Sequence, residues 1–384
     1  MSPPNKSKSI KIVHVIAGLG DGGAEGVLTR LCLNSSKAAH VVISLTDEGK
    51  YGPVLRENGV TVYSLGMNPG MPRLGRFFRL MRHIRSEKPD VVQTWMYHAD
   101  LVGGLAARLA GVPNIFWGIR QSTLEKGRSK RLTAMIARLC AVLSYIVPEK
   151  IICCANKVKE VHGELGYCKS KLTVIPNGYD LSKFKPSEDA RNWVREQLGV
   201  SRGEILLGMV GRYHPQKNHR NLLEALSLLI EWGHSFRCVL VGTDMSTDNH
   251  PLLEEIIKLG LAESILLAGP RTDIPELMNA LDVHVLSSST EGFPNVVAES
   301  MACGTPCVST DVGAAAEIIA DTGTVCLPES PEALAQSILI LLDEQIERPE
   351  LWSNRKRRAR ERIAGLYSLE RTIGMFESAW HLTE

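Results

Sequence analysis

Short apolar runs rich in β-branched residues alternate along the chain with longer segments in which apolar residues recur at helical spacing. The short runs have the length and composition of strands buried on both faces of a sheet. Strand and helix alternating in this way are typical of a doubly wound α/β fold with a parallel sheet. In the first half we predict strands at Ile10–Ala17, Val41–Leu45, Thr61–Ser64, Val91–Thr94, Asn114–Trp117 and Lys150–Cys154.

The same alternation starts again after the segment Val174–Asp180, whose Pro, Asn and Gly suit a sharp link between two sheets. A length of 384 residues also fits two domains. The predicted fold class is therefore α/β, with two doubly wound Rossmann-like domains. In the second half we predict a helix at Asp189–Leu198 and strands at Ile205–Val210, Arg237–Val241, Ile265–Leu267 and Asp282–Leu286. We expect a disordered leader at 1–9, domains at 10–185 and 186–365, and a C-terminal helix at 366–384.

From the composition and the cysteine usage we expect a cytoplasmic protein. Its 44% hydrophobic and 22% charged residues are ordinary for a globular chain. The nine cysteines include no Cys-x-x-Cys pair, and Cys303 and Cys307 have no nearby His, so we expect buried thiols in a reducing compartment. The polar first nine residues do not resemble a signal peptide, and no run of about eighteen apolar residues is present to span a bilayer.

The small net charge of +2 hides two oppositely charged halves. The chain up to Lys185 has 27 Lys+Arg and 13 Asp+Glu, or +14, and the remainder has 44 − 27 = 17 and 42 − 13 = 29, or −12. The first half therefore suits an acidic partner: an anionic membrane surface, a pyrophosphate-linked lipid or a nucleic acid. Between Arg73 and Arg85 an arginine recurs every third residue beside apolar residues, which predicts a basic amphipathic helix that is either solvated or docked on anionic lipid. The basic run Arg355–Arg362 is expected to be a solvated helix face.

A glycine-rich turn, Gly18–Gly23, lies between the first predicted strand and a helix from Ala24. Gly18, Gly20 and Gly23 match the dinucleotide fingerprint, and Asp47 follows the next strand where a ribose-binding acid would fall. One hypothesis is therefore an NAD-dependent dehydrogenase. Gly23 would let the backbone approach a phosphate closely, whether that phosphate belongs to a dinucleotide or to another diphosphate ligand.

Two carboxylates, Glu291 and Glu299, bracket a turn that joins an apolar strand to a helix. Gly292, Pro294 and Asn295 are poor interior residues for either element, so the strand ends and the helix begins here, and the first helical amides are an anion site. A bound group that carries both an anion and hydroxyls would satisfy the amides and the two carboxylates.

Other candidate ligand contacts follow predicted strands, at the edge where open α/β sheets bind ligands. Arg212 and Lys217 follow Ile205–Val210 and supply a planar fork and a point charge for a group with about two negative charges. Tyr97 and His98 follow one strand of the first half and Arg120 follows the next. We expect these last three residues to line one crevice.

The turn from Glu291 to Glu299 resembles the acid-x7-acid motif of the large family of retaining glycosyltransferases that includes sucrose synthase and lipopolysaccharide and mannoside transferases. Val174–Asp180 resembles the family's interdomain signature, and Arg212 and Lys217 resemble its paired diphosphate cations. The resemblance implies the glycosyltransferase B-type (GT-B) architecture, with the last helix crossing back to the first domain. It also implies a nucleotide-sugar donor, expected to be UDP-linked, retention of anomeric configuration, no metal and no cofactor.

The resemblance also implies roles for individual residues. Glu291 contacts the donor sugar, and we assign catalytic roles to Glu291 and His98. Many family members carry a His where this chain has Ile119 and Arg120, and we expect Tyr97 and Arg120 to contact the acceptor. The expected donor-binding residues are Gly22, Gly23, Arg212, Lys217, Ile274, Gly292, Phe293, Pro294, Asn295, Val296 and Glu299.

The expected partners are a nucleotide sugar and a glycan or lipid-linked acceptor, with no nucleic acid, and the basic first domain would contact an anionic membrane at the inner face. The predicted function is hexosyl or N-acetylhexosaminyl transfer in bacterial-type cell-surface glycan synthesis. A dehydrogenase and a non-catalytic nucleotide-sugar-binding scaffold are the alternatives.

Overall fold

The computed structural model describes residues 10–67, 74–122 and 131–382. The expected leader at 1–9 lies outside these ranges, as do Arg73 and the basic residues Lys126, Arg128 and Lys130. The chain forms two compact units. The first contains the chain up to Gly178 together with the segment from Glu370 onward, and the second runs from Tyr179 to Leu369.

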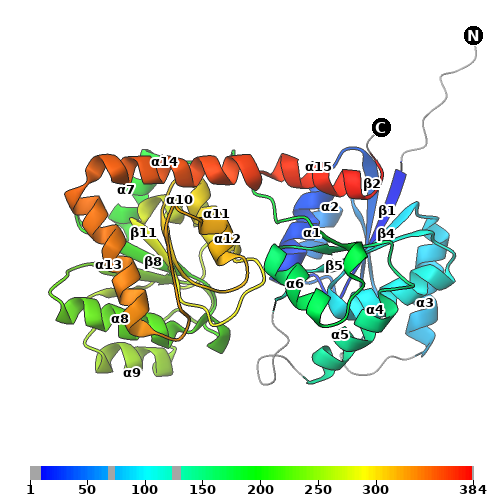
Figure 1. Cartoon of the computed structure of the whole chain (residues 1–384), viewed down its shortest axis with the longest axis horizontal. Helices are drawn as coiled ribbons and strands as arrows, with labels where there is room; N and C mark the ends of the chain where they lie inside the picture. The colour runs from blue at the N-terminus through cyan, green and yellow to red at the C-terminus, as the bar shows by residue number, and fades with distance from the viewer. Residues whose placement is uncertain (1–9, 68–73, 123–130, 383–384) are drawn as a thin grey trace, which may run out of the picture. The chain divides into compact units, whose positions relative to one another are not determined.

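The first unit has a parallel sheet of seven strands in the order β3-β2-β1-β4-β5-β6-β7 (Figure 1). The order reverses direction between β1 and β4, which pair through residues such as Ile12 and Val91. Ligands bind in doubly wound folds at such a switch point, beyond the carboxyl ends of the strands. The strands are β1 Ile10–Ile16, β2 Ala38–Ser44, β3 Thr61–Ser64, β4 Val91–Trp95, β5 Asn114–Ile119, β6 Lys150–Cys153 and β7 Leu172–Val174. The helices are α1 Gly23–Asn34, α2 Tyr51–Glu57, α3 Leu74–Glu87, α4 Met96–Leu109, α5 Arg131–Leu143, α6 Asn156–Glu164, the 3-10 turn η1 Lys169–Lys171 and α15 Leu369–Ala379.

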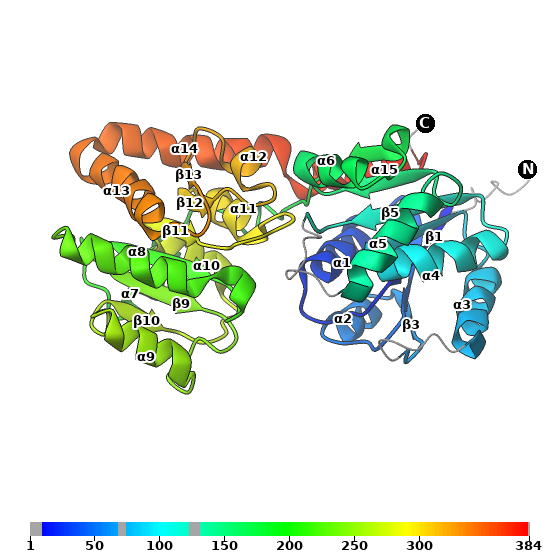
Figure 2. The same ribbon diagram turned by 60° about the horizontal axis from the view of Figure 1, so that its bottom comes forward.

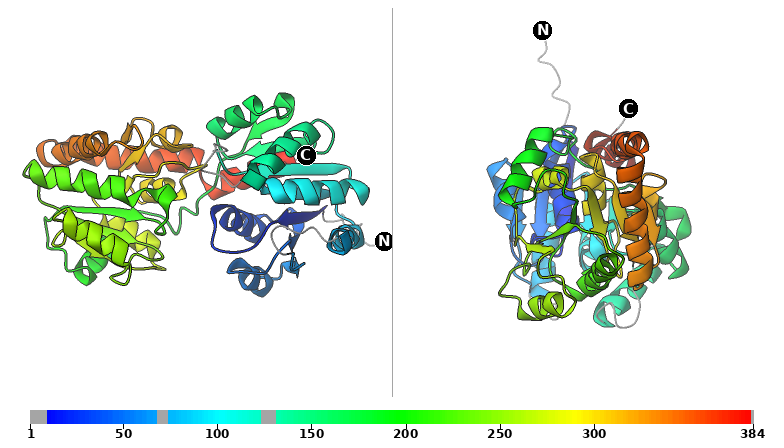
Figure 3. Two further views of the ribbon diagram at one scale, coloured as in Figure 1. Left: turned by 90° about the horizontal axis from the view of Figure 1, so that it is seen from below. Right: turned by 90° about the vertical axis from the view of Figure 1, so that its left-hand side faces the viewer.

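The second unit has a parallel sheet of six strands in the order β10-β9-β8-β11-β12-β13, with helices on both faces (Figure 3). Alternating residues of β8 divide between two cores: Leu207 packs with α8, α9 and α13, whereas Leu206 packs with α7 and α10. The strands are β8 Leu206–Val210, β9 Arg237–Val241, β10 Ile265–Leu267, β11 Val283–Leu286, β12 Cys307–Thr310 and β13 Thr324–Cys326. The helices are α7 Glu188–Gln197, η2 Pro215–Lys217, α8 His219–Glu231, α9 His250–Lys258, α10 Ile274–Ala280, α11 Asn295–Ala302, α12 Ala315–Ile319, α13 Pro331–Glu347 and α14 Pro349–Leu366.

The division between the units falls at Gly178 and Tyr179, before the expected boundary at 185. The physical reason is that Tyr179 forms an isolated parallel bridge with Ser368. Its amide donates to the carbonyl of Tyr367, and its own carbonyl accepts from the amide of Leu369. The chain therefore already belongs to the second unit at Tyr179.

After its first residue, α15 is part of the first unit. Phe376 packs against Trp95 of β4 with ring centroids 6.0 Å apart, and the indole N–H of Trp380 donates to Gln93 at 3.1 Å. These contacts pack two aromatic rings of α15 against residues of β4. The C-terminal helix is thus built into the core of the first unit.

The basic run in α14 is only partly the solvated face that we expected: Arg357 is exposed, but Arg360 and Arg362 are not. Arg360 donates to the carbonyl oxygens of Leu181 at 3.0 Å and Ala302 at 2.6 Å, and also to that of Phe184. Arg362 donates to the carbonyl of Ile318 at 2.8 Å. Free carbonyls at helix ends and in the link segment accept from these guanidinium groups, so the arginines attach α14 to its own unit.

None of the helices in the described ranges combines the length and the apolar character that a membrane-crossing segment needs.

Candidate active site

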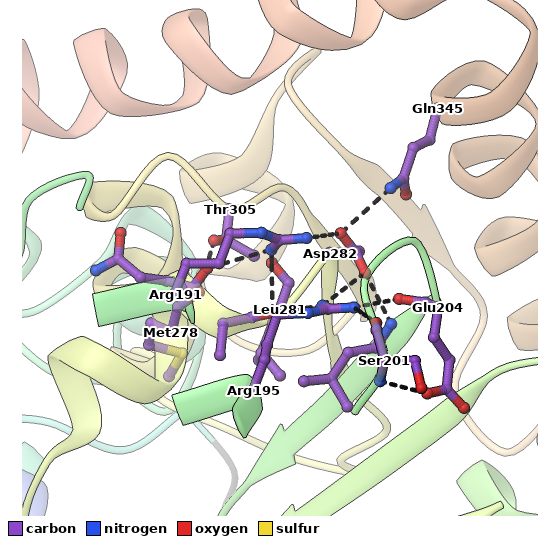
Figure 4. A network of polar contacts seen from close by, with 12 residues as sticks. Arg191, Arg195, Ser201, Glu204, Met278, Leu281, Asp282, Thr305 and Gln345 are labelled. Carbon is purple, nitrogen blue, oxygen red and sulfur yellow. Dashed lines mark hydrogen bonds and ion pairs between the residues drawn. The ribbon is translucent and has the colours of Figure 1, made fainter. Parts of the chain in front are cut away.

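The strand that carries the candidate site, β11, is anchored by a buried carboxylate at its start. Asp282 accepts from Arg191 at 2.7 Å and from Arg195 at 3.3 Å, both on α7 (Figure 4). It also accepts from the amide of Leu206 at 2.7 Å and from Gln345 of α13 at 3.2 Å. Because two guanidinium groups and an amide satisfy the carboxylate, its burial is compensated. The network fixes β11 relative to β8 and to helices on both faces.

At its other end β11 leads into the turn from Glu291 to Glu299, and α11 begins at Asn295 as predicted. Pro294, at the N-cap position of α11, makes no side-chain capping hydrogen bond, and the amide of Val297 donates to the carbonyl of Pro294 at 3.1 Å. The start of a helix carries the positive end of the helix dipole, which attracts anions. The turn is supported by Gly313, which has φ +56°. A Cβ there would lie 2.5 Å from the carbonyl oxygen of Glu291 and 2.6 Å from that of Gly292. Only glycine allows this close approach of two backbone segments.

The structure brings Lys217 and Glu291 together. Nζ of Lys217 lies 2.6 Å from Oε1 of Glu291, and both side chains are largely buried. The hydroxyl of Ser288 donates to the same carboxylate oxygen at 2.7 Å. Two donors on one oxygen fix the position of the carboxylate, and the ion pair places a cation at the first residue of the turn that leads into α11.

Backbone and amide contacts bring η2 next to this turn. The side-chain amide of Gln216 donates to the carbonyl of Thr290 at 2.9 Å, and the carbonyl of Gln216 accepts from the amide of Ser289 at 2.9 Å. These contacts hold Lys217 where it meets Glu291. Neither Gln216 nor Ser288 was predicted, because no local sequence pattern marks which side chains will meet across two loops.

The remaining predicted donor residues of the second unit lie on loops that follow its strands or on the first turns of the helices after those loops. Arg212 is exposed, and the glycine before it packs against Gly242, where a Cβ would collide with the carbonyl of Gly211. Ile274 begins α10, directly after Asp273, which pairs with Arg271 through an Nε–Oδ1 distance of 2.8 Å. Gly292, Val296 and Glu299 are half-buried, and Phe293 and Pro294 are buried.

Tyr179 connects the link segment to the same turn. Its hydroxyl donates to Oδ1 of Asn295 at 2.7 Å. Phe293 stacks on Tyr179 with ring centroids 6.5 Å apart and meets Tyr367 edge-on at 5.7 Å. The first residue of the second unit therefore holds the first residue of α11. The sequence placed Tyr179 in the interdomain signature but gave no sign of this contact.

In the first unit, Gly22 and Gly23 lie at the start of α1. A Cβ at Gly22 would collide with the carboxylate of Glu25, which lies back over the helix start. Burial raises the pKa of Glu25. Any phosphate that approaches Gly22, from a dinucleotide or from a nucleotide sugar, would therefore have Glu25 as a neighbour.

The three candidates after β4 and β5 do not form one group. Tyr97 is 1% exposed, and its hydroxyl bonds Nε2 of His162 at 2.8 Å, so it is a core residue. Arg120 donates to the carbonyl of Ile175 at 3.1 Å and to Asn177 at 2.9 Å, and its guanidinium lies over Trp95. These contacts give both side chains structural roles.

His98 is exposed at the start of α4. The preceding turn includes Met96 at φ +69°, a strained conformation for a residue with a side chain. Partial desolvation lowers the pKa of His98, which keeps the imidazole neutral near pH 7. Of the three candidates, His98 is the one placed to meet a ligand.

One cluster in the described ranges, His14, Cys32 and His40, has ligand atoms close enough to hold a metal ion. The indole N–H of Trp95 donates to Nδ1 of His14 at 3.3 Å. Nε2 of His14 therefore carries the proton and donates to Nδ1 of His40 at 2.9 Å. Since that proton occupies the place of a metal, we interpret the cluster as a hydrogen-bonded chain in the core.

Two family models match most of the chain. The model described as "Glycosyltransferase Family 4" matches residues 21–183, and the model described as "Glycosyl transferases group 1" matches residues 191–361. The matches fall on the two parallel-sheet halves and include every candidate donor residue named above.

Among curated proteins, the chain is 32% identical over 236 residues to an Escherichia coli UDP-Gal:alpha-D-GlcNAc-diphosphoundecaprenol alpha-1,3-galactosyltransferase. That match covers 61% of this chain and 60% of the relative, so the chain spans less than two thirds of that protein. It is 26% identical to a Campylobacter jejuni N,N'-diacetylbacillosaminyl-diphospho-undecaprenol alpha-1,3-N-acetylgalactosaminyltransferase, covering 82% of this chain and 85% of the relative.

Solved structures agree on the fold. Anabaena HepE, crystallised with UDP, superposes with a TM-score of 0.84 at 21% identity and covers 97% of this chain and 100% of that one. WaaG, a glycosyltransferase involved in lipopolysaccharide biosynthesis, has a TM-score of 0.73 at 20% identity and covers 95% and 99%. The predicted pair of doubly wound domains is confirmed, and the chain belongs to the glycosyltransferases of the GT-B fold, with a family 4 domain preceding a group 1 domain.

Proposed function

We propose that this protein is a retaining glycosyltransferase that moves a hexosyl or N-acetylhexosaminyl group from a UDP-sugar to a glycan or lipid-linked acceptor. The reaction would serve bacterial-type cell-surface glycan synthesis at the inner face of the membrane. The observation that carries the proposal is the pairing of Lys217 with Glu291 in the turn that leads into α11. The names of the relatives, two of which act on diphosphoundecaprenol-linked sugars, support the class of acceptor.

Donor binding would redistribute the partners of Lys217. A diphosphate brought to the amides of α11 would compete for the ammonium group and release Glu291 to bind sugar hydroxyls. Arg212 is exposed and precedes Lys217 in the segment after β8, and it would supply the second cation. Cations and amides placed where the diphosphate leaves would stabilise the charge that develops there, without a metal ion.

The other donor contacts follow the family resemblance. Glu299 would bind the ribose hydroxyls, the backbone near Ile274 would receive the base, and Gly22 and Gly23 would approach the diphosphate. On the acceptor side we retain His98, whose neutral imidazole would hydrogen-bond a hydroxyl of the reacting sugars. No protein base is needed if the leaving phosphate takes the acceptor proton.

The test is a transfer assay with UDP-glucose, UDP-galactose and their N-acetylated forms, a diphosphoundecaprenol-linked sugar as acceptor, and a chelator present throughout. We expect one donor to give a product whose new linkage has the α configuration of the donor by NMR. A β-linked product would overturn retention. Loss of activity in the chelator, restored by Mg²⁺, would overturn metal independence.

A further inference from the structure

Helix α5 in the first unit carries an exposed apolar stripe. Leu132, Met135, Leu139 and Val142 are separated by three or four residues, so they lie on one face of the helix. All four are exposed, Met135 at 62% and Val142 at 69%. Tyr145 and Ile146, in the turn after α5, are also exposed and continue the stripe. Single exposed apolar residues are ordinary, but six in one helix and its following turn form a continuous surface.

The opposite face of α5 is fully used inside the unit. Ala137, Cys140 and Ala141 are buried, and α5 packs through this face against α4 (Figure 2). Small side chains allow that close packing. The packing partner of α5 within the unit is therefore α4, and the exposed stripe is a separate face of the helix.

The charged residues on the exposed face are all basic. Arg131 and Arg138 are exposed on α5, and the sequence from Arg131 to Pro148 contains no acidic residue. An apolar stripe bordered by arginine, with a tyrosine at one end, has the composition of a helix that lies in the interface of an anionic bilayer. The excess of basic residues in the chain up to Lys185 adds a longer-range attraction to such a surface.

A second copy of the chain fits this stripe less well. A two-fold contact would place the stripe against itself and bring Arg131 and Arg138 close to the same arginines of the other copy. No carboxylate on the stripe would compensate that repulsion. Anionic lipid headgroups supply the missing negative charge.

Helix α3, on the other side of α4, is the basic amphipathic helix that the arginine pattern predicted (Figure 2). Its inward residues Leu80 and Ile84 are buried, and its exposed face carries Arg79, Arg82 and Arg85. It has fewer exposed apolar residues than α5. It would add electrostatic attraction, whereas α5 has the side chains that can enter the bilayer.

We propose that the exposed face of α5, formed by Leu132, Met135, Leu139, Val142, Tyr145 and Ile146 with Arg131 and Arg138, docks this protein on an anionic lipid bilayer. The inference rests on the proposed function, because the purpose of docking would be to reach an acceptor embedded in the bilayer.

The test is co-sedimentation of the full chain with phosphatidylcholine vesicles that contain about a third phosphatidylglycerol. We expect the vesicle affinity of the double variant Met135→Gln/Val142→Gln to be at least about tenfold lower than that of wild type, since two side chains no longer enter the interface. The matched control is Ile257→Gln/Ile346→Gln, which changes two equally exposed side chains of the second unit, 60% and 66% exposed. Arg131→Gln/Arg138→Gln should weaken binding to the anionic vesicles and leave the residual binding to pure phosphatidylcholine unchanged.

Equal vesicle binding by wild type and the α5 variant, or no binding by wild type, would overturn the inference. So would a wild-type dimer in light scattering that the α5 variant converts to a monomer, because the stripe would then bind a second copy. UDP titration of the same proteins separates this test from that of the function. Retained UDP binding without vesicle binding refutes the docking surface alone, and vesicle binding without UDP binding refutes the donor site alone.

Discussion

Lys217 and Glu291 form an ion pair of 2.6 Å between two loops at the carboxyl end of the second sheet. The pair places a cation that can bind diphosphate in contact with a carboxylate that can bind sugar. Under the proposed function, each group has a protein partner that the nucleotide sugar would replace.

Glu291→Gln should lower the turnover number by about a hundredfold or more, because a charge that acts on the developing sugar cation is lost. UDP affinity should be unchanged or higher, since Lys217 no longer has a competing carboxylate. Initial rates and calorimetry measure the two effects, with the exposed Glu263→Gln as control. Turnover equal to wild type would remove Glu291 from the mechanism.

Ser288→Ala tests whether the hydroxyl positions Glu291. The carboxylate would lose one of two donors to the same oxygen, and we expect the turnover number to fall about tenfold while UDP affinity stays constant. Ser227→Ala, which removes a hydroxyl bonded to the carbonyl of Leu259, is the control for loss of a serine elsewhere in the unit. A change in UDP affinity without a change in turnover would contradict a role through Glu291.

Gly313→Ala should destabilise the protein by more than the cost of placing an alanine at a positive φ. Gly260 also has a positive φ, +70°, but a Cβ there meets no atom within 4 Å. Gly260→Ala should therefore cost about 1 kcal/mol, and Gly313→Ala about 1–3 kcal/mol more, because its Cβ collides with two carbonyl oxygens. Urea unfolding gives both values. Equal losses would mean that the turn moves aside freely.

Tyr179→Phe removes the hydroxyl that holds Asn295. We expect a loss of about 1 kcal/mol in the free energy of unfolding and a lower turnover number, because the start of α11 is less firmly placed. Tyr367→Phe is the control, since its hydroxyl bonds the carbonyl of Glu317 at 3.5 Å and the side chain of Arg362, and neither residue belongs to the turn. Full activity in Tyr179→Phe would show that the ring contacts alone position the turn.

Asp100, fully buried in the first unit, predicts a pH dependence of stability. Burial raises its pKa to about 7, although Thr94 and the amide of Gly118 donate to its Oδ1. The folded state thus holds a proton that the unfolded state releases near pH 4, and this contribution to stability is lost as pH rises from about 4 to about 7.

Asp100→Asn removes that titration and can keep the Oδ1 contacts. The free energy of unfolding of wild type minus that of the variant should therefore fall by a few kcal/mol across the same pH range. The difference is needed because burial lowers the pKa of His162 and His219 to about 4, and these groups destabilise the fold as pH falls from about 6.5. A difference that does not change with pH would contradict the raised pKa.

The sheets and the start of α11 could be predicted because their signals are local. Runs such as that before Glu291 are apolar and β-branched, and glycine, proline and asparagine end them where the chain must turn. The same reasoning could not tell that Tyr97 is buried and His98 is exposed. A shift of one residue at the start of a helix decides whether a side chain faces the core or the surface.

Contacts between distant segments were not predictable from the sequence. Ser288 reads as one serine in a run of three, and only the packed turn shows that its hydroxyl reaches Glu291. Arg360 reads as part of a charged helix, but carbonyl groups of the link segment and α11 surround it. The outward face of α5 has the apolar spacing of a core helix, and burial alone distinguishes the two cases.

The measurement that tests the account most directly is calorimetric titration of the wild-type chain and of Arg212→Ala with UDP in a chelator, with GDP and NAD as competitors. We predict that UDP binds wild type without added metal and binds Arg212→Ala at least about tenfold more weakly, because one cation of the diphosphate site is lost. Binding of NAD and not UDP, or UDP binding that Arg212→Ala does not change, would contradict a nucleotide-sugar site at these residues.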